Sequence, residues 1–491
     1  MTKLMEPLFE LPISLPPKGS RELLRAVHGQ MRAAILDGRL QSGTRLPSTR
    51  AFAAAVGVSR NTAVAAYDLL LSEGYLVVRP GAGTYVANIQ PRLHRSRASA
   101  APPAAEEHLH EPWRAPAPAL PRVSGVPCRG DFRVGLPDKA SFPFPVWRRL
   151  SARALRALSK ASPLYDQPQG REALRRAIAK HVSFARAVCC APDQVVVTAG
   201  AQQAFDLLAR ILVTPGQTVV AVEEPGYPPL RNAVAAAGGK IVAIPVDAEG
   251  LIVDSLPAET RVICVTPSHQ FPLGITMSTG RRGALLEFAR ERGAVLIEDD
   301  YDGEFRLGGR PLDALQTLDR GESVFYVGSF SKSLFPELRL GFVIAPTWAL
   351  PALVAAKSCA DWHCPTLTQD TLADFIAEGH LARHVRKMGK VYSGRRAALL
   401  QALSRYCGDR LRPMGDAVGL HLAATLGDEL PASRLVEAAA ADGIRLQSLE
   451  RYAMVTATPN GLAFGFGMIP AEQIEEAVSR LALTIKSAAC P

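Results

Sequence analysis

The chain has 491 residues, a mass of 52.6 kDa and a formal net charge of +10. Apolar residue types make up 48% and charged types 21%, a composition that is typical of a folded globular protein and excludes global disorder. No apolar run reaches the ~18–20 residues of a membrane-spanning helix, and residues 1–20 lack the charged-then-apolar pattern of a signal peptide. We therefore expect a multidomain cytoplasmic protein without a membrane partner.

The positive charge is concentrated near the N-terminus. Residues 1–90 hold ten basic and six acidic side chains, and residues 91–130 hold six and three. Such a region indicates a polyanionic partner, although a solvated basic surface would have the same composition. The eight cysteines include no Cys-x-x-Cys pair, so we expect free thiols. Cys359, His363 and Cys364 lack further ligands for a tetrahedral site, and we predict no metal site.

Residues 14–87 have the pattern of a small helical domain. Apolar residues at helical spacing predict a first helix over residues 21–36, and Ser48 and Ser59 are placed to cap a second and a third helix. Residues 76–79 and 84–87 are expected to form two short strands joined by a turn that contains glycine. Three helices with a tight turn before the third, followed by a hairpin, predict a winged helix-turn-helix.

In that geometry the first turn of the third helix enters the major groove of DNA, where side chains contact bases and phosphates. Basic residues elsewhere on the domain would neutralise backbone phosphates, which fix the position of the protein without carrying sequence information. The predicted DNA-binding residues are Ser59, Arg60, Asn61 and Thr62 on the third helix, with Arg45, Arg50 and the wing residue Arg79.

Residues 88–127 are predicted to be a linker. They contain eight prolines and many alanines, with neither helical nor alternating periodicity. A segment of this composition is an extended and semi-rigid tether. It could set the reach between two domains or act as a passive spacer.

From residue 128 on, helical stretches alternate with short runs of valine and isoleucine. Apolar runs without alternation indicate strands that are buried on both faces, so we expect a largely parallel α/β sheet. We place the large domain at residues 165–350 and a smaller C-terminal subdomain at residues 380–491. Ligands of such folds bind beyond the carboxyl ends of the strands.

Several of these strand ends carry residues that together could hold pyridoxal 5′-phosphate. This cofactor needs an amine to form a Schiff base, an anion beside its ring nitrogen and a site for its phosphate dianion. Lys332 and Asp299 fit the first two roles, Tyr227 could stack on the ring, and Tyr301 could bind the ring hydroxyl. The predicted phosphate site comprises Gly200, Ala201 and Gln202 at a helix N-terminus together with Ser329, Ser331 and Arg339.

The motifs also resemble a known family. The segments RLPSTR, GVSRNTA and RPGAGTYV are similar to the DNA-binding domain of GntR-type repressors, and TAGAQQ, EEPGYP, IEDDYDGEF and SFSKSLFPELRLG resemble the aminotransferase-like half of MocR-type regulators. This resemblance implies a fold-type I aminotransferase-like domain and a homodimer in which Tyr165 reaches the partner's phosphate. It also implies that His269 and Gln270, in the TPSHQFPLG segment, are secondary candidates for contact with the ring.

Two departures from the family pattern concern this site. Leu273 replaces a threonine or serine, a change that we expect to matter little. Aminotransferases of this fold commonly bind the substrate carboxylate with an arginine near the C-terminus, but no arginine lies between Arg451 and Arg480, and Ala463 stands at that place. The loss of a bidentate contact of this kind disfavours catalytic transamination.

The sequence therefore predicts a transcription regulator that binds a double-stranded DNA operator as a homodimer. Its C-terminal domain would sense an amine, an amino acid or pyridoxal 5′-phosphate itself through Lys332. The alternatives are an active aminotransferase with an autoregulatory DNA-binding domain and, third, a scaffold that has lost the cofactor.

Overall fold

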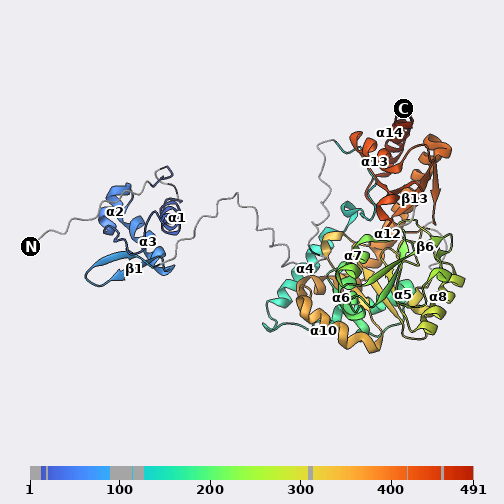
Figure 1. Cartoon of the computed structure of the whole chain (residues 1–491), viewed down its shortest axis with the longest axis horizontal. Helices are drawn as coiled ribbons and strands as arrows, with labels where there is room; N and C mark the ends of the chain where they lie inside the picture. The colour runs from blue at the N-terminus through green and yellow to red at the C-terminus, as the bar shows by residue number, and fades with distance from the viewer. Residues whose placement is uncertain are drawn as a thin grey trace, which may run out of the picture. The chain divides into compact units, whose positions relative to one another are not determined.

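The computed structural model describes residues 13–17, 20, 22–88, 113, 127–307, 313–416, 418–454 and 458–489. Contacts between residues divide the chain into two compact units, Met1–His110 and Glu111–Pro491, which Figure 1 shows in blue and in cyan to red. Most of the predicted linker at 88–127 lies outside the described residues. Among the described residues, no helix is both long enough and apolar enough to cross a bilayer.

Within its described residues, the first unit has three helices and a hairpin, as predicted. Its elements are α1 (Leu23–Leu36), α2 (Thr49–Val56), α3 (Arg60–Ser72), β1 (Leu76–Arg79) and β2 (Gly83–Val86). Both predicted caps are present, because the Ser48 hydroxyl accepts from Ala51 N and the Ser59 hydroxyl accepts from Thr62 N. The second strand begins and ends one residue earlier than expected, and it pairs with β1 in antiparallel register.

A large mixed sheet forms the centre of the second unit. Its strand order is β4-β11-β10-β9-β8-β5-β6-β7. The strands are β4 (Val195–Thr198), β5 (Val219–Glu224), β6 (Lys240–Asp247), β7 (Gly250–Leu251), β8 (Thr260–Val265), β9 (Val295–Asp300), β10 (Val324–Ser329) and β11 (Gly341–Ile344). Antiparallel pairing is confined to β11 and β7, so the expectation of a largely parallel sheet is confirmed.

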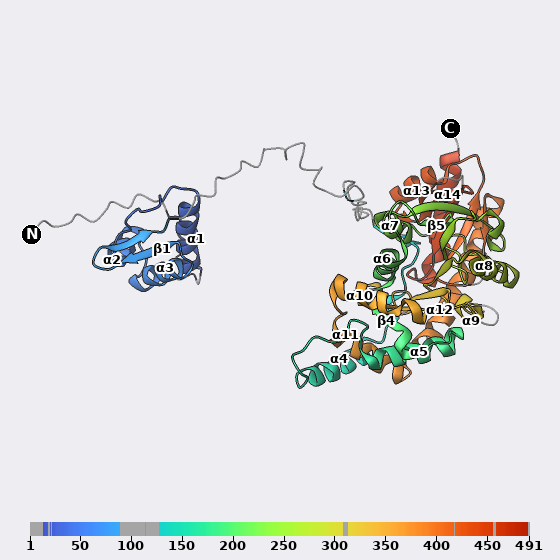
Figure 2. The same ribbon diagram turned by 60° about the horizontal axis from the view of Figure 1, so that its bottom comes forward.

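Helices cover both faces of this sheet, which is why its strands are apolar without alternation. One apolar cluster joins the sheet to α6, α7 and α10, and others join it to α8 and to α4, α5 and α11. Figure 2 shows α6 and α7 together beside β5. The bounds are α4 (Phe144–Leu158), α5 (Glu172–Arg186), α6 (Ala201–Leu212), α7 (Pro228–Ala236), α8 (Thr279–Arg292), α9 (Leu315–Leu318), α10 (Leu350–Asp361) and α11 (Thr366–Ala377).

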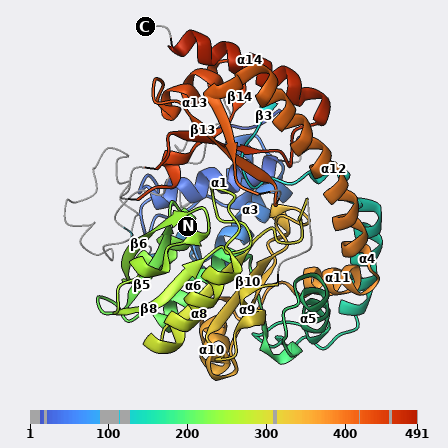
Figure 3. The ribbon, with the colours of Figure 1, turned by 90° about the vertical axis from the view of Figure 1, so that its right-hand side faces the viewer.

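The C-terminal part of the second unit has its own sheet and apolar core, which we call the small subdomain. Its strands β12 (Leu411–Met414), β13 (His421–Leu426), β16 (Gly461–Gly465) and β15 (Gln447–Ser448) are antiparallel. A short parallel pair joins β3 (Gly130–Asp131) to β14 (Ile444–Arg445). Helices α12 (His380–Ala402), α13 (Ala432–Ala441) and α14 (Ala471–Ala489) complete it, and Figure 3 shows α12 running from beside α11 into the small subdomain.

Candidate functional site

A cavity of about 580 Å³ lies beyond the carboxyl ends of β5, β9 and β10. It brings together nearly all the residues that the sequence predicted for the cofactor, because parallel strands end at the same edge of the sheet. The predicted residues that line it are Ala201, Gln202, Tyr227, Asp299, Tyr301, Ser329, Ser331, Lys332 and Arg339. Gly200 lies against Arg339 at the same end of the cavity.

Lys332 follows β10 and lines this cavity. Its Nζ atom donates a hydrogen bond to the Gly135 carbonyl oxygen at 2.7 Å. Burial lowers the pKa of Lys332, while the carboxylates of Asp302 and Asp299 oppose that shift. A lowered pKa increases the neutral fraction of an amine, and the neutral form is the one that attacks a carbonyl.

Asp299, near the end of β9, is 3% exposed and lines the cavity floor. Its Oδ1 atom is buried and has no hydrogen-bond partner among the described residues. Burial, followed by the neighbouring carboxylates of Asp300 and Asp302, raises the pKa of Asp299 well above its usual range. An ionised carboxylate at this position therefore needs a cationic donor, such as a protonated ring nitrogen.

The N-terminus of α6 offers backbone N–H groups to an anion. Gly200 precedes this helix with φ +77° and ψ 176°, a conformation that is open to glycine and almost closed to other residues. A Cβ atom there would lie 3.1 Å from the guanidinium nitrogens of Arg339. Arg339 donates to the Ala199 carbonyl oxygen, and Ser329 accepts from Ser331 N.

The two predicted aromatic residues both contact Phe271. Tyr227 precedes α7, and its ring meets that of Phe271 edge to face at 5.3 Å. Tyr301 meets the same ring edge to face at 5.9 Å. Burial and nearby carboxylates, Asp302 first among them, raise the pKa of Tyr301 well above its usual range, so its hydroxyl stays protonated and able to donate.

Three predicted contacts do not line this cavity. Tyr165 is 80% exposed and packs beside Trp362, with ring centres 5.3 Å apart. His269 and Gln270 are each 1% exposed and lie behind the lining, where Gln270 donates to the carbonyl oxygens of Pro225 and Phe271. Both residues are close to the site but make their contacts with protein atoms.

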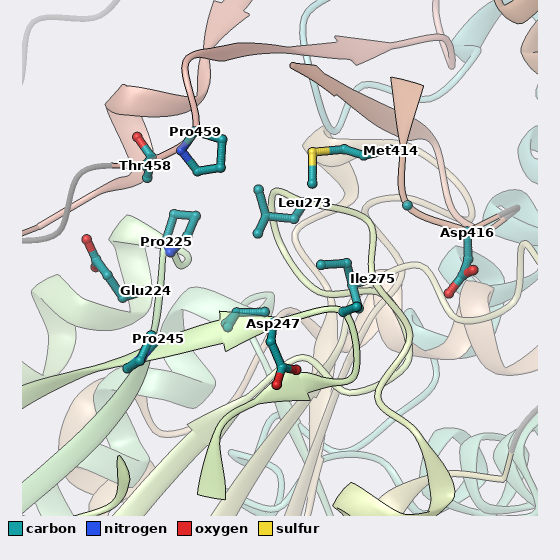
Figure 4. Close-up of a pocket in the computed structure, with 13 residues that line it drawn as sticks. Glu224, Pro225, Pro245, Asp247, Leu273, Ile275, Met414, Asp416, Thr458 and Pro459 are labelled. Carbon is teal, nitrogen blue, oxygen red and sulfur yellow. The ribbon is translucent and has the colours of Figure 1, made fainter. Parts of the chain in front are cut away.

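Leu273 belongs to a different cavity of about 500 Å³, which is lined by both the large sheet and the small subdomain. In Figure 4 its side chain lies near Met414 and Pro225, with Ile275 and Asp247 below. The loop after β8 thus contributes Phe271 to the cavity around Lys332 and Leu273 to this second one. This location agrees with the expectation that the change to leucine matters little at the cofactor site.

Sequence reasoning missed Arg451, which lines the Lys332 cavity together with Gln447 and Tyr452. These residues come from β15 and the short 3₁₀ helix after it, which carry no strand-end pattern. Ala463, at the place of the usual arginine, lies on β16 and is fully buried against Tyr452 and Phe271. The structure therefore places an arginine in the cavity that comes from a different segment of the chain.

The predicted DNA-binding residues lie on one small domain. Arg45, Arg50, Arg60, Asn61 and Arg79 are exposed, and Arg79 stacks on the Tyr85 ring at 4.6 Å. The side chains of Ser59 and Thr62 are already bound to each other at 2.8 Å. The cations are thus free of described ion pairs, while the two hydroxyl residues also hold the start of α3.

Comparison with known proteins agrees with both units. Residues 131–481 match the family model of aminotransferase class I and II, and residues 23–86 match that of bacterial regulatory proteins, gntR family. The chain therefore belongs to the aminotransferase class I and II family and carries a GntR-type winged helix.

Relatives have the same fused organisation. The chain is 37% identical to a probable rhizopine catabolism regulatory protein, MocR, of Rhizobium meliloti, over 93% of this chain and 92% of that protein. It is 33% identical to the pyridoxine biosynthesis transcriptional regulator PdxR of Corynebacterium glutamicum, over 94% and 95%. The crystal structure of LysN, an α-aminoadipate aminotransferase of Thermus thermophilus complexed with N-(5′-phosphopyridoxyl)-L-leucine, is 30% identical with a TM-score of 0.67, covering 73% of this chain and 92% of that one.

These findings define a DNA-binding transcription regulator of the MocR type. Its cofactor is pyridoxal 5′-phosphate, the cofactor of the fold-type I aminotransferase domain. The cavity fits this group, since it offers an amine, a buried carboxylate oxygen without a partner among the described residues, and a helix N-terminus beside an arginine.

Proposed function

We propose that this cytoplasmic regulator senses an amine, an amino acid or pyridoxal 5′-phosphate itself in the Lys332 cavity, and that occupancy of the cavity changes how its winged helix binds an operator. The observation that carries the proposal is the presence of the cavity and of an exposed, cationic winged helix in one chain. A ligand changes an equilibrium only by its different affinity for two states, so the DNA-binding arrangement must differ between occupied and empty cavities.

The proposed roles follow from the position of each side chain in the cavity. Bound pyridoxal 5′-phosphate supplies an aldehyde that amines capture and a ring that withdraws electrons. The Lys332 amine would form the Schiff base, Asp299 would pair with the ring nitrogen, Tyr227 would cover a ring face and Tyr301 would donate to the ring hydroxyl. The residues proposed to hold the phosphate are Gly200, Ala201, Gln202, Ser329, Ser331 and Arg339.

Arg451 supports an effector that carries a carboxylate as well as an amine. The cationic residues among the described lining of the cavity are Lys332, Arg339 and Arg451. If Lys332 holds the cofactor and Arg339 its phosphate, Arg451 is left to bind a further anion. A guanidinium binds a carboxylate through two parallel hydrogen bonds, which favours an amino acid over a simple amine.

We further propose a homodimer that binds paired operator half-sites. Exposed apolar side chains lie on and after α4, with Leu155 55%, Leu158 41% and Leu164 81% exposed. Tyr165 follows them and is 80% exposed, so it is available to reach a partner's phosphate site. Two-fold symmetric regulators bind half-sites whose spacing matches the protein dimer, with Arg60 and Asn61 in the major groove.

DNA binding in the presence and absence of ligands tests this proposal. Fluorescence anisotropy would measure the affinity of the full chain for DNA from upstream of its own gene, with and without pyridoxal 5′-phosphate and a panel of amino acids. We expect at least one ligand to change the affinity or the half-site preference of the wild type but not of Lys332→Ala. Absence of specific DNA binding under every condition would contradict the proposal.

The same preparation tests the alternative of an active aminotransferase, which the presence of Arg451 in the cavity favours. Repeated turnover of an amino donor with a keto acid would support an enzyme, and absence of turnover would count against it. Lys332→Ala should lose the visible absorption of bound cofactor. If the variant kept the wild-type band, the assignment of Lys332 would be wrong.

A further inference from the structure

Two charged side chains beside the large sheet hold the segment that carries Arg451, and the function proposed above gives them no role. Arg231 lies on α7, and Glu224 is the last residue of β5. Their side chains are 11% and 1% exposed, and Nη1 of Arg231 lies 3.8 Å from Oε2 of Glu224. A buried ion pair of this kind adds little net stability compared with apolar residues of the same size. Its effect should therefore lie in what it orients.

Both side chains bind the backbone of the small subdomain directly after Arg451. Nη1 of Arg231 donates to the Tyr452 carbonyl oxygen at 2.7 Å. Oε1 of Glu224 accepts from Met454 N at 2.6 Å. Because a charged group takes part in each of these hydrogen bonds, they are stronger than bonds between neutral groups. The pair thus fixes this backbone to the edge of the large sheet.

The position of Arg451 depends on that backbone. Its side chain is exposed, lines the Lys332 cavity and makes no hydrogen bond or ion pair with the described residues. The location of its guanidinium group is therefore set by the main chain at residues 451 and 452. A bidentate bond to a carboxylate tolerates little displacement, because two nitrogens must face two oxygens at once.

We propose that Arg231, together with Glu224, is a positioning residue that holds the Tyr452 backbone so that Arg451 can bind the carboxylate of an effector. Arg231 thereby contributes to the preference of the cavity for an amino acid over the matched amine. It is not among the described residues that line the cavity, so it acts through Arg451. This inference rests on the proposed role of Arg451.

Two probes that differ by one carboxylate test the inference without knowledge of the effector. Aminooxyacetate and O-ethylhydroxylamine carry the same aminooxy nitrogen, which bonds to the aldehyde carbon of bound pyridoxal 5′-phosphate and releases the Lys332 amine. The quantity measured, on the full chain loaded with the cofactor, is the second-order rate constant for loss of the visible absorption band. The ratio of the two rate constants, which we call the carboxylate preference, cancels any change that affects both probes alike.

The expected changes follow from the contacts that each variant removes. Arg451→Gln should lower the carboxylate preference by about tenfold to a hundredfold, because a charge-assisted bond is lost. Arg231→Gln should lower it by about threefold, since the Gly226 N–H still donates to the Tyr452 carbonyl oxygen. Arg231→Lys should keep most of the preference, because one nitrogen, Nη1, makes both contacts of Arg231 and an ammonium can replace it.

A double variant and a matched control separate positioning from a general loss of structure. Arg231→Gln/Arg451→Gln should have the preference of Arg451→Gln alone, whereas independent effects would multiply. The control is Arg281→Gln, which should leave the preference unchanged. Arg281 lies on α8 and is 15% exposed, and it pairs with Asp247 and donates to the Leu251 carbonyl oxygen at 2.7 Å.

Circular dichroism would confirm that each variant is folded. If Arg231→Gln does not fold, Arg231→Met/Glu224→Gln takes its place, because it removes both buried charges together and leaves neither without a partner of opposite charge. The expected fall in carboxylate preference is the same for this variant, since it also lacks the donor to the Tyr452 carbonyl oxygen.

Three results would overturn the inference. The first is an unchanged carboxylate preference in the folded Arg231 variant when Arg451→Gln lowers it, and the second is a double variant in which the two losses multiply. The third is an equal fall in Arg281→Gln, which would mark a general effect of instability. An unchanged preference in Arg451→Gln, or the absence of a cofactor band in the wild type, would instead show that the proposed function is wrong, and the role of Arg231 with it.

Discussion

The winged helix and the Lys332 cavity hold their functional groups in opposite ways. On the winged helix, Arg45, Arg50 and Arg60 are exposed and project from a core that they do not build. In the cavity, Asp299 and Lys332 are enclosed, and burial shifts the pKa of each. Substitution of an exposed arginine should therefore change binding and leave stability unchanged, whereas substitution of a buried cavity residue should change both ligand binding and stability. This difference determines what each substitution should report.

A core substitution in the winged helix should have the largest effect. Phe52 is fully buried, with its ring 5.2 Å from that of Tyr67. Phe52→Ala should lower the free energy of unfolding of the winged helix by about 3–5 kcal/mol through lost burial and the resulting cavity. The chain divides into two compact units, so we expect two unfolding transitions in scanning calorimetry. Phe52→Ala should lower the transition temperature of the winged helix and leave that of the second unit unchanged.

The matched control is Phe464→Ala, since Phe464 is fully buried in the core of the small subdomain. It should lower the other transition and leave that of the winged helix unchanged. A single transition that moves with both variants would show that the two units unfold together, contrary to the comparison above.

An exposed arginine should change DNA binding without changing stability. Arg60→Ala removes a side chain from the first turn of α3 and should weaken specific operator binding by about 1–3 kcal/mol if it contacts a base. The unfolding transition should stay within about 0.5 kcal/mol of the wild type. Anisotropy titrations at fixed salt would measure the affinity.

Arg25→Ala provides the comparison, because Arg25 is an exposed arginine on α1 that is not among the predicted contacts. Equal losses of affinity in the two variants would indicate a general charge effect rather than base recognition by Arg60. A loss that is independent of DNA sequence would have the same meaning.

A buried carboxyl near the cavity should make stability depend on pH. Burial raises the pKa of Glu223 to about 7 from an ordinary value of 4.5. The folded state therefore binds more protons than the unfolded state between these values, and stability falls as pH rises through this window, by at most about 1.4 kcal/mol per pH unit. Glu223→Gln should remove this part of the pH dependence and stabilise the protein above pH 7.

Urea denaturation at pH 5, 6, 7 and 8 would measure the effect. Glu437→Gln, which changes an exposed carboxylate on α13, should leave the slope unchanged. If the wild type and Glu223→Gln had parallel pH profiles, Glu223 would titrate alike in the folded and unfolded states.

The sequence predicted the cavity residues that follow strands and missed those that do not. Asp299 and Lys332 could be placed together because β9 and β10 are parallel neighbours whose carboxyl ends coincide. Arg451 reaches the same cavity through the packing of the small subdomain, and no periodicity in its own segment encodes that contact. The carbonyl of Gly135 is likewise a backbone group, which residue types do not reveal.

The position of His269 illustrates a second limit. His269 could be named from its motif, but the prediction directed it toward the cofactor ring. In the structure its ring faces Asp302 and the backbone of Gly419, which is 150 residues away in the chain. Long-range contacts of this kind depend on how the small subdomain packs on the sheet, which a single sequence does not specify.

The smallest effect concerns Ser59, where capping and DNA contact compete for one hydroxyl. Its oxygen accepts from Thr62 N at 3.1 Å and pairs with the Thr62 hydroxyl at 2.8 Å. Ser59→Ala should therefore destabilise the winged helix by about 1 kcal/mol, seen as a lower midpoint of its own thermal transition. This result alone would not separate the two roles.

Ser59→Asp separates them. Aspartate caps a helix as well as serine does, so the thermal transition should return to the wild-type position. Its negative charge would however repel DNA phosphates near the start of α3, so operator affinity should fall further than in Ser59→Ala. Because salt screens this repulsion, the difference in affinity between the two variants should be smaller at high salt than at low salt. Wild-type affinity in Ser59→Asp would show that this hydroxyl only caps the helix, and that DNA contact at this turn falls to Arg60 and Asn61.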